Sequence, residues 1–285
     1  MIRLGSIVSL LALALMSSAF AEGLSIASWN IKTIEVKRVY QVKEWEERVP
    51  YTVEFIEMMD NDVIGMQEAT LILLVSLLNR MPQYRFVGMA SRDGKKSGNY
   101  NPIFYKHEKL DLVESRTFWL SETPNKPSMG WDTDSKRVCT WALFREKSSG
   151  TTFAVYNTHL DHIGGNARVN GARLILDSLA RHGGAPVFLM GDFNSERGGD
   201  VYSLLNNSGI VKDSYGVAQK KLASSGTFNA FDTGKEPQKI IDFVFVNEMV
   251  EVMRYSVLNN FYWKSGKPRY YSDHFPVSLL VKLKK

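Results

Sequence analysis

The chain has 285 residues, of which 44% are hydrophobic and 23% charged; 35 Lys and Arg residues against 30 Asp and Glu residues give a formal charge of +5. This composition is that of a globular protein, and the length suffices for one large domain or two small ones around a buried core. The single cysteine, Cys139, excludes an internal disulfide and is expected to be a small core residue. The basic pI of about 9.1 favours encounters with polyanions such as nucleic acid or anionic lipid.

The N-terminus has the pattern of a secretory signal sequence. Arg3 precedes an apolar run at 7–16, and the small-residue sequence Ala19-Phe20-Ala21 follows. The run is short for a membrane span, and an A-x-A pattern marks a signal cleavage site. We therefore expect residues 1–21 to be a signal peptide and 22–285 to be one exported domain, periplasmic or secreted, without a transmembrane segment.

Strand-like and helix-like segments alternate along the rest of the chain. The expected strands are residues 24–31, 62–69, 102–106, 138–144, 152–160, 185–193, 240–246 and 275–283. The expected helices are residues 42–60, 70–81 and 166–181, and Pro50 should kink or restart the first of them. No Pro- or Ser-rich linker interrupts the chain, which favours one layered α/β or α+β domain. The least regular part, 91–137, reads as long surface loops of the kind that often bind substrates.

Several of these strands end in polar residues. The polar positions are Asn30, Gln67, Glu68, Asn157, His159, Asp161, His162, Asp192, Asn194, Asp242, Asp273 and His274. Burying one such group without a partner costs about 1–3 kcal/mol, so repeating that cost at six strands indicates a shared purpose.

Each polar residue also has a purely structural explanation when it is taken alone. Glu68 could cap the following helix, His159 could be a hydrogen-bonded core histidine, and Asp242 could bond to nearby backbone. In the sequence VFLMGDFNSE, Asp192 and Asn194 share one face of an extended segment, but Gly-Asp-x-Asn is equally good turn chemistry. Together the residues form a set of carboxylates, amides and imidazoles without cysteine. Such a set suits a hard divalent ion, Mg²⁺ or Mn²⁺ with Ca²⁺ as an alternative, better than zinc.

In chain order, six motifs resemble those of the endonuclease/exonuclease/phosphatase superfamily, the DNase I-like metal-dependent phosphodiesterases. The motifs are SWNIK, MQEA, NTHLDH, GDFNS, IDFVFV and SDHFPV. The resemblance covers residues 25–283 and looks closest to a bacterial exported branch. It implies an α+β fold, a four-layer α/β/β/α sandwich of two packed mixed β-sheets flanked by helices, with the active site where strand ends converge at one end.

The resemblance also implies a metal site. Glu68 would be the principal metal ligand, with Asn30 beside it and Asp273 completing the site. A phosphodiester is anionic and repels a hydroxide nucleophile until a cation and aimed donors neutralise its charge, so a metal ion suits this chemistry.

Five further residues receive catalytic roles from the resemblance. Asp192 would orient or deprotonate the attacking water, Asn194 would hold the scissile phosphate, and His159 would donate to a phosphate oxygen. His274, oriented by Asp242, would act as general base or phosphate stabiliser, because an Asp–His pair fixes the imidazole tautomer and favours its charged form. The sequence leaves open whether Asp192 or His274 accepts the proton of water.

The motifs name the reaction but not the substrate, which the loops must select. We expect substrate contacts from Arg92, Tyr105 and Arg137. Trp119 and Trp131 are either stacking platforms for bases or, more in keeping with tryptophan in general, anchors of the core and loops.

The leading hypothesis is an exported Mg²⁺-dependent phosphodiesterase acting on nucleic acid, a nuclease that works as a monomer without a stable protein partner. A phosphatase or a lipid phosphodiesterase of the inositol phosphate or sphingomyelin type is the alternative, and the aromatic segment 259–267 is a weak hint of membrane contact. A non-catalytic secreted binding module would predict broken catalytic positions, and none of the eight is broken.

Overall fold

The computed structural model describes residues 23–34, 39–182 and 184–284. The expected signal peptide, residues 1–21, lies outside them. Among the described residues, no helix combines the length and the apolar character that crossing a bilayer requires.

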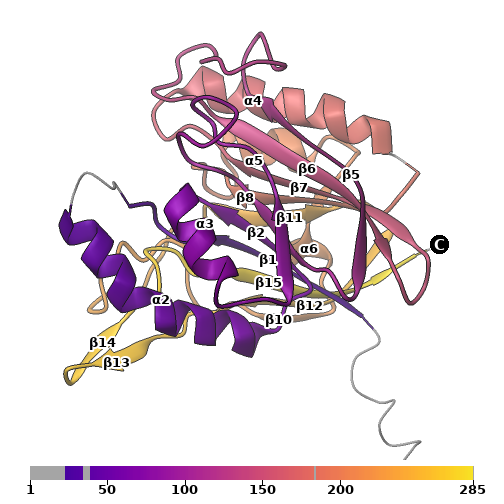
Figure 1. Cartoon of the computed structure of the whole chain (residues 1–285). Helices are drawn as coiled ribbons and strands as arrows, with labels where there is room; N and C mark the ends of the chain where they lie inside the picture. The colour runs from indigo at the N-terminus through magenta and orange to yellow at the C-terminus, as the bar shows by residue number, and fades with distance from the viewer. Residues whose placement is uncertain (1–22, 35–38, 183, 285) are drawn as a thin grey trace, which may run out of the picture.

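Two mixed β-sheets pack face to face in the centre of the molecule (Figure 1). The first sheet has the strand order β10-β12-β15-β1-β2-β4-β3. Its strands are β1 (Leu24–Asn30), β2 (Val63–Gln67), β3 (Tyr84–Val87), β4 (Ile103–Lys106), β10 (Lys220–Leu222), β12 (Val250–Val257) and β15 (Val277–Leu283). The second sheet has the order β5-β6-β7-β8-β11-β9. Its strands are β5 (Leu110–Trp119), β6 (Val138–Glu146), β7 (Thr152–His159), β8 (Val187–Asp192), β9 (Lys212–Asp213) and β11 (Asp242–Val246).

Helices cover the outer face of each sheet. α2 (Val39–Met59) and α3 (Leu71–Leu78) pack on the first sheet, and α4 (Gly165–Leu179) with α5 (Asp200–Asn206) packs on the second. A 3₁₀ turn, η1 (Ala180–His182), extends α4, and α6 (Ser214–Val217) is a single turn. A small hairpin, β13 (Tyr262–Lys264) and β14 (Lys267–Arg269), stands apart from both sheets. The α/β/β/α order of layers confirms the fold class that the motifs predict.

Alternation along each strand divides the core into three parts. In β1, Leu24 and Ile26 face the second sheet, whereas Ala27 and Trp29 pack under the helices. In β8, Phe188 and Met190 face the first sheet, and Leu189 packs beneath α4. Successive side chains of a strand point to opposite faces of the sheet, so a strand that is covered on both faces needs apolar side chains at successive positions.

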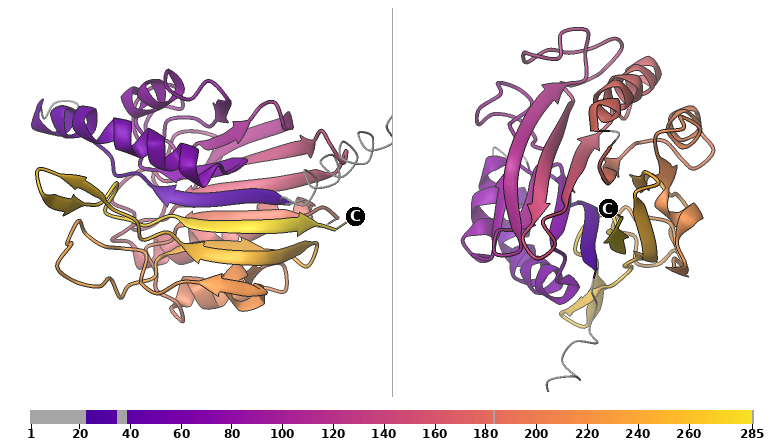
Figure 2. Two further views of the ribbon diagram at one scale, coloured as in Figure 1. Left: turned by 90° about the horizontal axis from the view of Figure 1, so that it is seen from below. Right: turned by 90° about the vertical axis from the view of Figure 1, so that its right-hand side faces the viewer.

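The same alternation carries polar side chains into the space between the sheets. Continuing each inward-facing row by two residues leads from Ile26 and Ser28 to Asn30 in β1, and from Met190 to Asp192 in β8. Both residues are buried at the strand end. In the left view of Figure 2, the arrowhead of β1 and the β13–β14 hairpin lie at one end of the sheet, opposite the C-terminus.

The structure departs from two expectations. Helix α2 continues through Pro50, so the helix does not restart there; Pro50 is exposed, and water can satisfy the Glu46 carbonyl that loses its hydrogen bond. Within the expected loop region 91–137, residues 110–119 form strand β5 at the edge of the second sheet. Its middle is exposed, and a bulge between Leu112 and Glu114 breaks the alternation, so the segment lacks the apolar pattern of a strand.

Candidate active site

Strand register aligns three polar side chains in the second sheet. Asp192 at the end of β8 pairs with His159 at the end of β7 on one side and with Asp242 at the start of β11 on the other. Residues directly opposite one another on neighbouring strands place their side chains side by side on one face. The three residues therefore form a row that faces the first sheet at one end of the sandwich.

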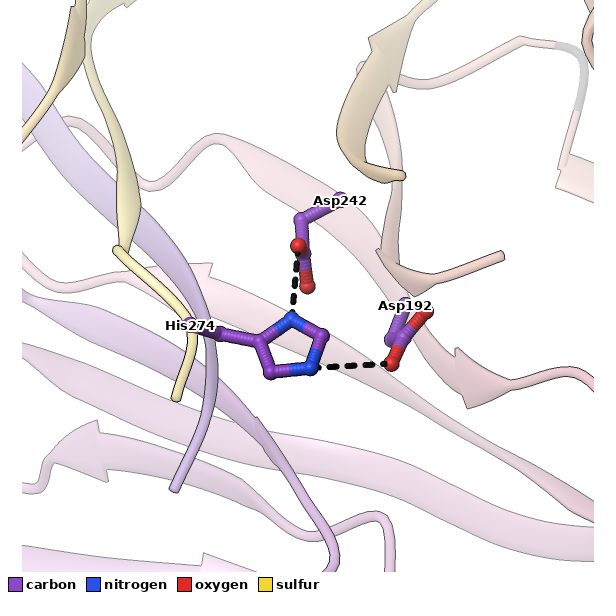
Figure 3. A group of neighbouring side chains, drawn as sticks. All are labelled: Asp192, Asp242 and His274. Atoms are coloured by element: carbon purple, nitrogen blue, oxygen red, sulfur yellow. Dashed lines mark hydrogen bonds and ion pairs between the residues drawn. The ribbon is translucent and has the colours of Figure 1, made fainter. Parts of the chain in front are cut away.

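His274 joins this row from the segment before β15. Its Nδ1 lies 2.9 Å from Oδ2 of Asp242, and its Nε2 lies 3.7 Å from Oδ2 of Asp192. Figure 3 shows the imidazole between the two carboxylates. Burial disfavours the charged imidazole, but the charge of Asp242, followed by that of Asp192, outweighs burial and raises the pKa of His274 to about 10. His274 is therefore cationic at neutral pH.

His159 lies on the other side of Asp192 and has the opposite protonation state. Its Nε2 is 3.4 Å from Oδ2 of Asp192 and 3.0 Å from Nδ2 of Asn194. Burial, assisted by the positive charge of Arg137, lowers the pKa of His159 to about 4. Burial also raises the pKa of Asp192. At neutral pH, Asp192 thus lies between a neutral imidazole, that of His159, and a cationic one, that of His274.

The first sheet contributes a carboxylate and an amide. Nδ2 of Asn30 donates to Oε1 of Glu68 at 3.1 Å and to Oδ2 of Asp192 at 3.0 Å, so its amide connects the two sheets. The backbone N–H of Thr33 donates to Oε2 of Glu68 at 2.9 Å. Burial opposes the ionised form of Glu68, but His159, Lys32 and these hydrogen bonds outweigh it and lower its pKa to about 2. Glu68 is therefore a carboxylate throughout the physiological range.

The donor set of this region fits a divalent cation. Glu68, Asn30 and Asp273 offer the oxygen ligands that hard cations prefer. The ammonium group of Lys32 lies 3.0 Å from Oδ2 of Asp273, and its charge also acts on Glu68, so these two carboxylates already share one positive charge. A second group of ligand atoms, from the buried residues Asp192, Asp242 and His274, lies within 4.8 Å and could also bind a metal ion.

Three residues of the site have left-handed backbone conformations. The φ angles are 60° at Lys32, 62° at Glu68 and 47° at Asn194. Each residue follows a strand of the central sheets by one or two positions. Side chains other than glycine adopt this region at an energetic cost, and such strain gathers at functional sites. The turns redirect the chain so that side chains past the strand ends still point into the site.

The residues surround an open cavity of about 640 Å³. Its lining includes Lys32, Glu68, Asn99, Ser135, Arg137, His159, His162, Asp192, Asn194, Glu196, Phe228, Lys239, Ile241, Asp273 and His274. The ring of Phe228 packs edge-on against His274 with centroids 5.0 Å apart, and so limits the movement of that imidazole. Three cationic side chains and three imidazoles line this polar cavity together with four acidic residues, and these donors suit an anionic substrate.

The family model described as Endonuclease/Exonuclease/phosphatase family matches residues 27–274. The chain belongs to this family. A family member from Bacteroides thetaiotaomicron of known crystal structure is 36% identical, with a TM-score of 0.87, over 91% of this chain and 97% of that one. A mannosyl-6-phosphatase from the same bacterium is 35% identical, also with a TM-score of 0.87, over 91% of this chain and 100% of its own. A protein of Acanthamoeba polyphaga mimivirus of unassigned function is 27% identical over 85% of this chain and 93% of its own.

All eight residues to which the family resemblance gives metal-binding or catalytic roles lie together at this end of the sandwich. Asn30, Glu68, His159, Asp192 and Asn194 follow or end strands, whereas Asp242, Asp273 and His274 begin or precede them. Six of them are buried, and Glu68 and Asn194 are half-buried and line the cavity. 

The residues expected to contact substrate fall in different places. Arg137 lines the cavity. Arg92 is exposed on a loop and is absent from the cavity lining. Tyr105 is 7% exposed and packs in the core between the sheets, with its ring centroid 4.9 Å from that of Phe144. Its position contradicts the expected contact, because Tyr105 lies in the inward-facing row of β4 and the second sheet covers it.

The two tryptophans also differ from stacking platforms. Trp119 is buried, and its Nε1–H donates to the carbonyl of Ser91 at 2.6 Å, so it anchors the neighbouring loop. Trp131 is 37% exposed but does not line the cavity. Trp119 thus follows the structural alternative, and Trp131 lies outside the described site.

Two of the polar residues at strand ends, Gln67 and Asn157, form hydrogen bonds between the sheets instead of facing the cavity. Nδ2 of Asn157 donates to the carbonyls of Met66 and Pro102, each at 2.7 Å, and its Oδ1 accepts from Nε2 of Gln67 at 2.7 Å. This buried amide pair joins β7 of the second sheet to β2 of the first. Because both side chains are buried in hydrogen bonds between the sheets, neither is available to substrate.

Some residues of the cavity escape the sequence-based prediction. Lys32 follows the SWNIK asparagine by two positions, and Asn99 and Lys239 come from loops without a recognisable pattern. Asp161 and His162 stand out in the sequence only as polar residues after a strand. The available signals were the adjacency of Lys32 to Asn30 within SWNIK and the place of Asp161 and His162 within NTHLDH.

Proposed function

We propose that the protein is an exported, divalent-metal-dependent phosphoester hydrolase that acts as a monomer, with a phosphomonoester as its favoured substrate. The observation that carries the proposal is the position of Asp192 between a neutral and a cationic imidazole, beside the oxygen ligands Glu68 and Asn30. Such a site can accept a proton from water and stabilise negative charge on phosphate at the same time.

The environments of the two histidines divide the catalytic roles. His274 remains protonated at neutral pH and cannot accept a proton, so it would donate a hydrogen bond to a phosphoryl oxygen. Asp192, whose pKa burial raises, is the better proton acceptor for water. His159 and Asn194 would hold the phosphate from the other side.

In the reaction, the oxygen of water bonds to phosphorus while the bond from phosphorus to the leaving oxygen breaks, and the leaving oxygen keeps the bonding electron pair and takes a proton from solvent. The proton of water passes to the carboxylate of Asp192, and Asp242 keeps His274 aimed by holding its Nδ1. Asn30, Glu68 and Asp273 would hold Mg²⁺, which supplies charge neutralisation at the phosphate when bound. The remaining groups orient the substrate.

A phosphomonoester is favoured because the mannosyl-6-phosphatase from Bacteroides thetaiotaomicron is 35% identical over 91% of this chain. A sugar phosphate is therefore the first substrate class to test. The second candidate is nucleic acid, as the sequence predicts, and the net charge of +5 together with Lys32 and Lys239 in the cavity supports it.

The test is hydrolysis by the purified protein of mannose 6-phosphate, plasmid DNA, single-stranded RNA and sphingomyelin, each with Mg²⁺ and with EDTA. We expect Mg²⁺-dependent release of phosphate from the sugar phosphate. Cleavage of DNA or RNA alone would replace the monoester with the nuclease function, and cleavage of sphingomyelin alone would favour the lipid alternative. Equal rates with Mg²⁺ and EDTA would contradict the proposed metal dependence.

A further inference from the structure

One wall of the cavity comes from two loops that carry none of the eight predicted metal-binding and catalytic residues. Ser135 and Arg137 precede β6, and His162 follows β7. The side chain of Arg137 is 13% exposed, which is a low value for an arginine at the edge of an open cavity. Its burial requires partners.

Asp161 holds the two loops together. Its Oδ2 accepts from Nε of Arg137 at 3.0 Å and from Oγ1 of Thr133 at 2.8 Å, while its Oδ1 accepts from the backbone N–H groups of Ile163 and Gly164. Burial opposes ionisation of Asp161, but these hydrogen bonds hold its pKa well below the usual range. Asp161 therefore stays a carboxylate and fixes one edge of the Arg137 guanidinium.

His162 fixes a second edge. Nη2 of Arg137 lies 2.9 Å from Nδ1 of His162. Arginine has no acceptor, so Nδ1 must accept this hydrogen bond, and the proton of the neutral imidazole resides on Nε2. Among the described residues, Nη1 of Arg137 has no hydrogen-bond partner. Within the residues that the structure describes, the two loops thus present a guanidinium with a free donor and an imidazole with a free N–H at the same wall.

The charge of Arg137 reaches the phosphate-binding residues. It contributes, after burial, to the low pKa of His159, whose Nε2 is 3.0 Å from Asn194. A terminal phosphate near neutral pH carries close to two negative charges and three non-bridging oxygens, whereas a phosphodiester carries one charge and two such oxygens. The additional guanidinium therefore matches the oxygen and charge that only a phosphomonoester has.

We propose that Arg137, positioned by Asp161 and His162, binds the terminal phosphate of the substrate and selects phosphomonoesters over phosphodiesters. This inference rests on the proposed function and names the residue that sets its substrate class. Arg137 would contact substrate, and Asp161 is a positioning residue that acts through it.

The experiment compares Arg137→Gln, Arg137→Lys and Asp161→Asn on p-nitrophenyl phosphate and bis(p-nitrophenyl) phosphate, which share one leaving group. We expect Arg137→Gln to lower kcat/KM for the monoester about 100-fold and that for the diester less than about fivefold. Arg137→Lys should recover part of the loss, because it restores the charge but not the planar fork. Asp161→Asn should raise KM for the monoester with a smaller effect on the diester.

Arg173→Gln is the matched control, since the exposed side chain of Arg173 hydrogen-bonds, within the described part of the chain, only to Asn170 on its own helix. It should leave both activities unchanged. Thermal unfolding of every variant separates a folding defect from a loss of binding. Equal loss on monoester and diester, or no loss on either, would overturn the role of Arg137.

A binding measurement keeps this inference separate from the proposed function. Isothermal titration with inorganic phosphate and with dimethyl phosphate, both in Mg²⁺, does not require turnover. A wild-type protein that hydrolyses neither ester would refute the proposed function alone. Binding of inorganic phosphate that weakens about tenfold or more in Arg137→Gln, with dimethyl phosphate unaffected, supports the selection by Arg137. No binding of phosphate to the wild type, or equal affinity in the variant, overturns it.

Discussion

His159 and His274 both lie close to Oδ2 of Asp192, at 3.4 and 3.7 Å, yet their pKa values move in opposite directions. His274 has a carboxylate of its own, Asp242, at its Nδ1, whereas His159 is buried near the cationic Arg137. At the scale of single residues, the difference between the two pKa values thus comes from the surroundings of each imidazole other than Asp192. These are the carboxylate of Asp242 at His274, and burial near Arg137 at His159.

Asp242→Asn should lower the pKa of His274 from about 10 toward 6.5. A histidine whose pKa is raised on folding stabilises the protein fully below pH 6.5, and this contribution is lost as the pH rises toward 10. The variant should therefore lose more stability at pH 6 than at pH 9, and its turnover should fall about 100-fold or more. Urea unfolding at both pH values and histidine NMR titration check these expectations.

The control is Asp213→Asn, which removes another buried carboxylate. Asp213 pairs with Arg197 and with Tyr202, whose pKa burial raises above the ordinary value for tyrosine. Its effect should be the same at both pH values. An identical pH-independent loss in Asp242→Asn would contradict the proposed ion pair with His274.

At the scale of secondary structure, the close approach of β7 and β8 places Asp192. Gly191 has a φ of +153°, and a Cβ at this position would lie 2.0 Å from the carbonyl oxygen of Thr158. Only glycine fits between the two strands at this point. The glycine of the GDFN motif therefore positions the acid and amide that follow it.

Gly191→Ala should destabilise the protein by about 3 kcal/mol and lower activity, because the strands must separate next to Asp192. Gly150→Ala is the control: Gly150 has a φ of +72° but no atom within 4 Å of an added Cβ. It should cost only about 1 kcal/mol and leave turnover intact. Urea unfolding and initial rates measure both effects, and equal losses in the two variants would argue against the steric explanation.

A second prediction at this scale concerns the buried amide pair between the sheets, Asn157 and Gln67. Asn157→Leu leaves two carbonyls and Nε2 of Gln67 without their 2.7 Å partners, and should cost about 2–4 kcal/mol. Since Gln67→Leu removes the same Asn157–Gln67 bond, the double variant should lose less stability than the sum of the single ones. Additive losses in a double-mutant cycle would mean that the two amides act independently.

At the scale of the whole molecule, the site bridges the two sheets, since Asn30 of β1 donates to Asp192 of β8. A ligand that binds here stabilises the folded state through mass action. At a hundredfold excess over its Kd, Mg²⁺ should stabilise the protein by about 2.7 kcal/mol and so raise Tm by several degrees.

Glu68→Gln should abolish most of this increase in Tm and most of the turnover. Its Tm in EDTA should fall below that of the wild type, because the folded protein stabilises the ionised carboxylate, so the response to Mg²⁺ is measured from each protein's own Tm in EDTA. Glu108→Gln is the control that should retain the response, because Glu108 is exposed and does not line the cavity. Differential scanning fluorimetry across a Mg²⁺ titration gives the comparison. A full Mg²⁺ response in Glu68→Gln would exclude Glu68 as a metal ligand.

Local patterns predict the central strands well because their side chains are buried on alternating rows, as in β1 and β8. They fail at β5, whose exposed middle and bulge leave only its ends with an apolar pattern. Of the three residues expected to contact substrate, only Arg137 lines the cavity, for a similar reason. Arg92, Tyr105 and Arg137 are alike as sequence positions, and only the packing of the second sheet buries Tyr105 and brings Arg137 to the cavity.

The sequence by itself determined the family, the layered α+β fold and the eight polar residues expected to carry the chemistry, because strand alternation and motif order are local properties of the chain. The tertiary structure decided how those residues differ from one another. Only the pairing of β7, β8 and β11 places Asp192 between His159 and Asp242, and only the meeting of two distant loops at Asp161 holds Arg137 in the cavity. These contacts depend on long-range packing, so burial and charge could assign the roles only after the chain was folded.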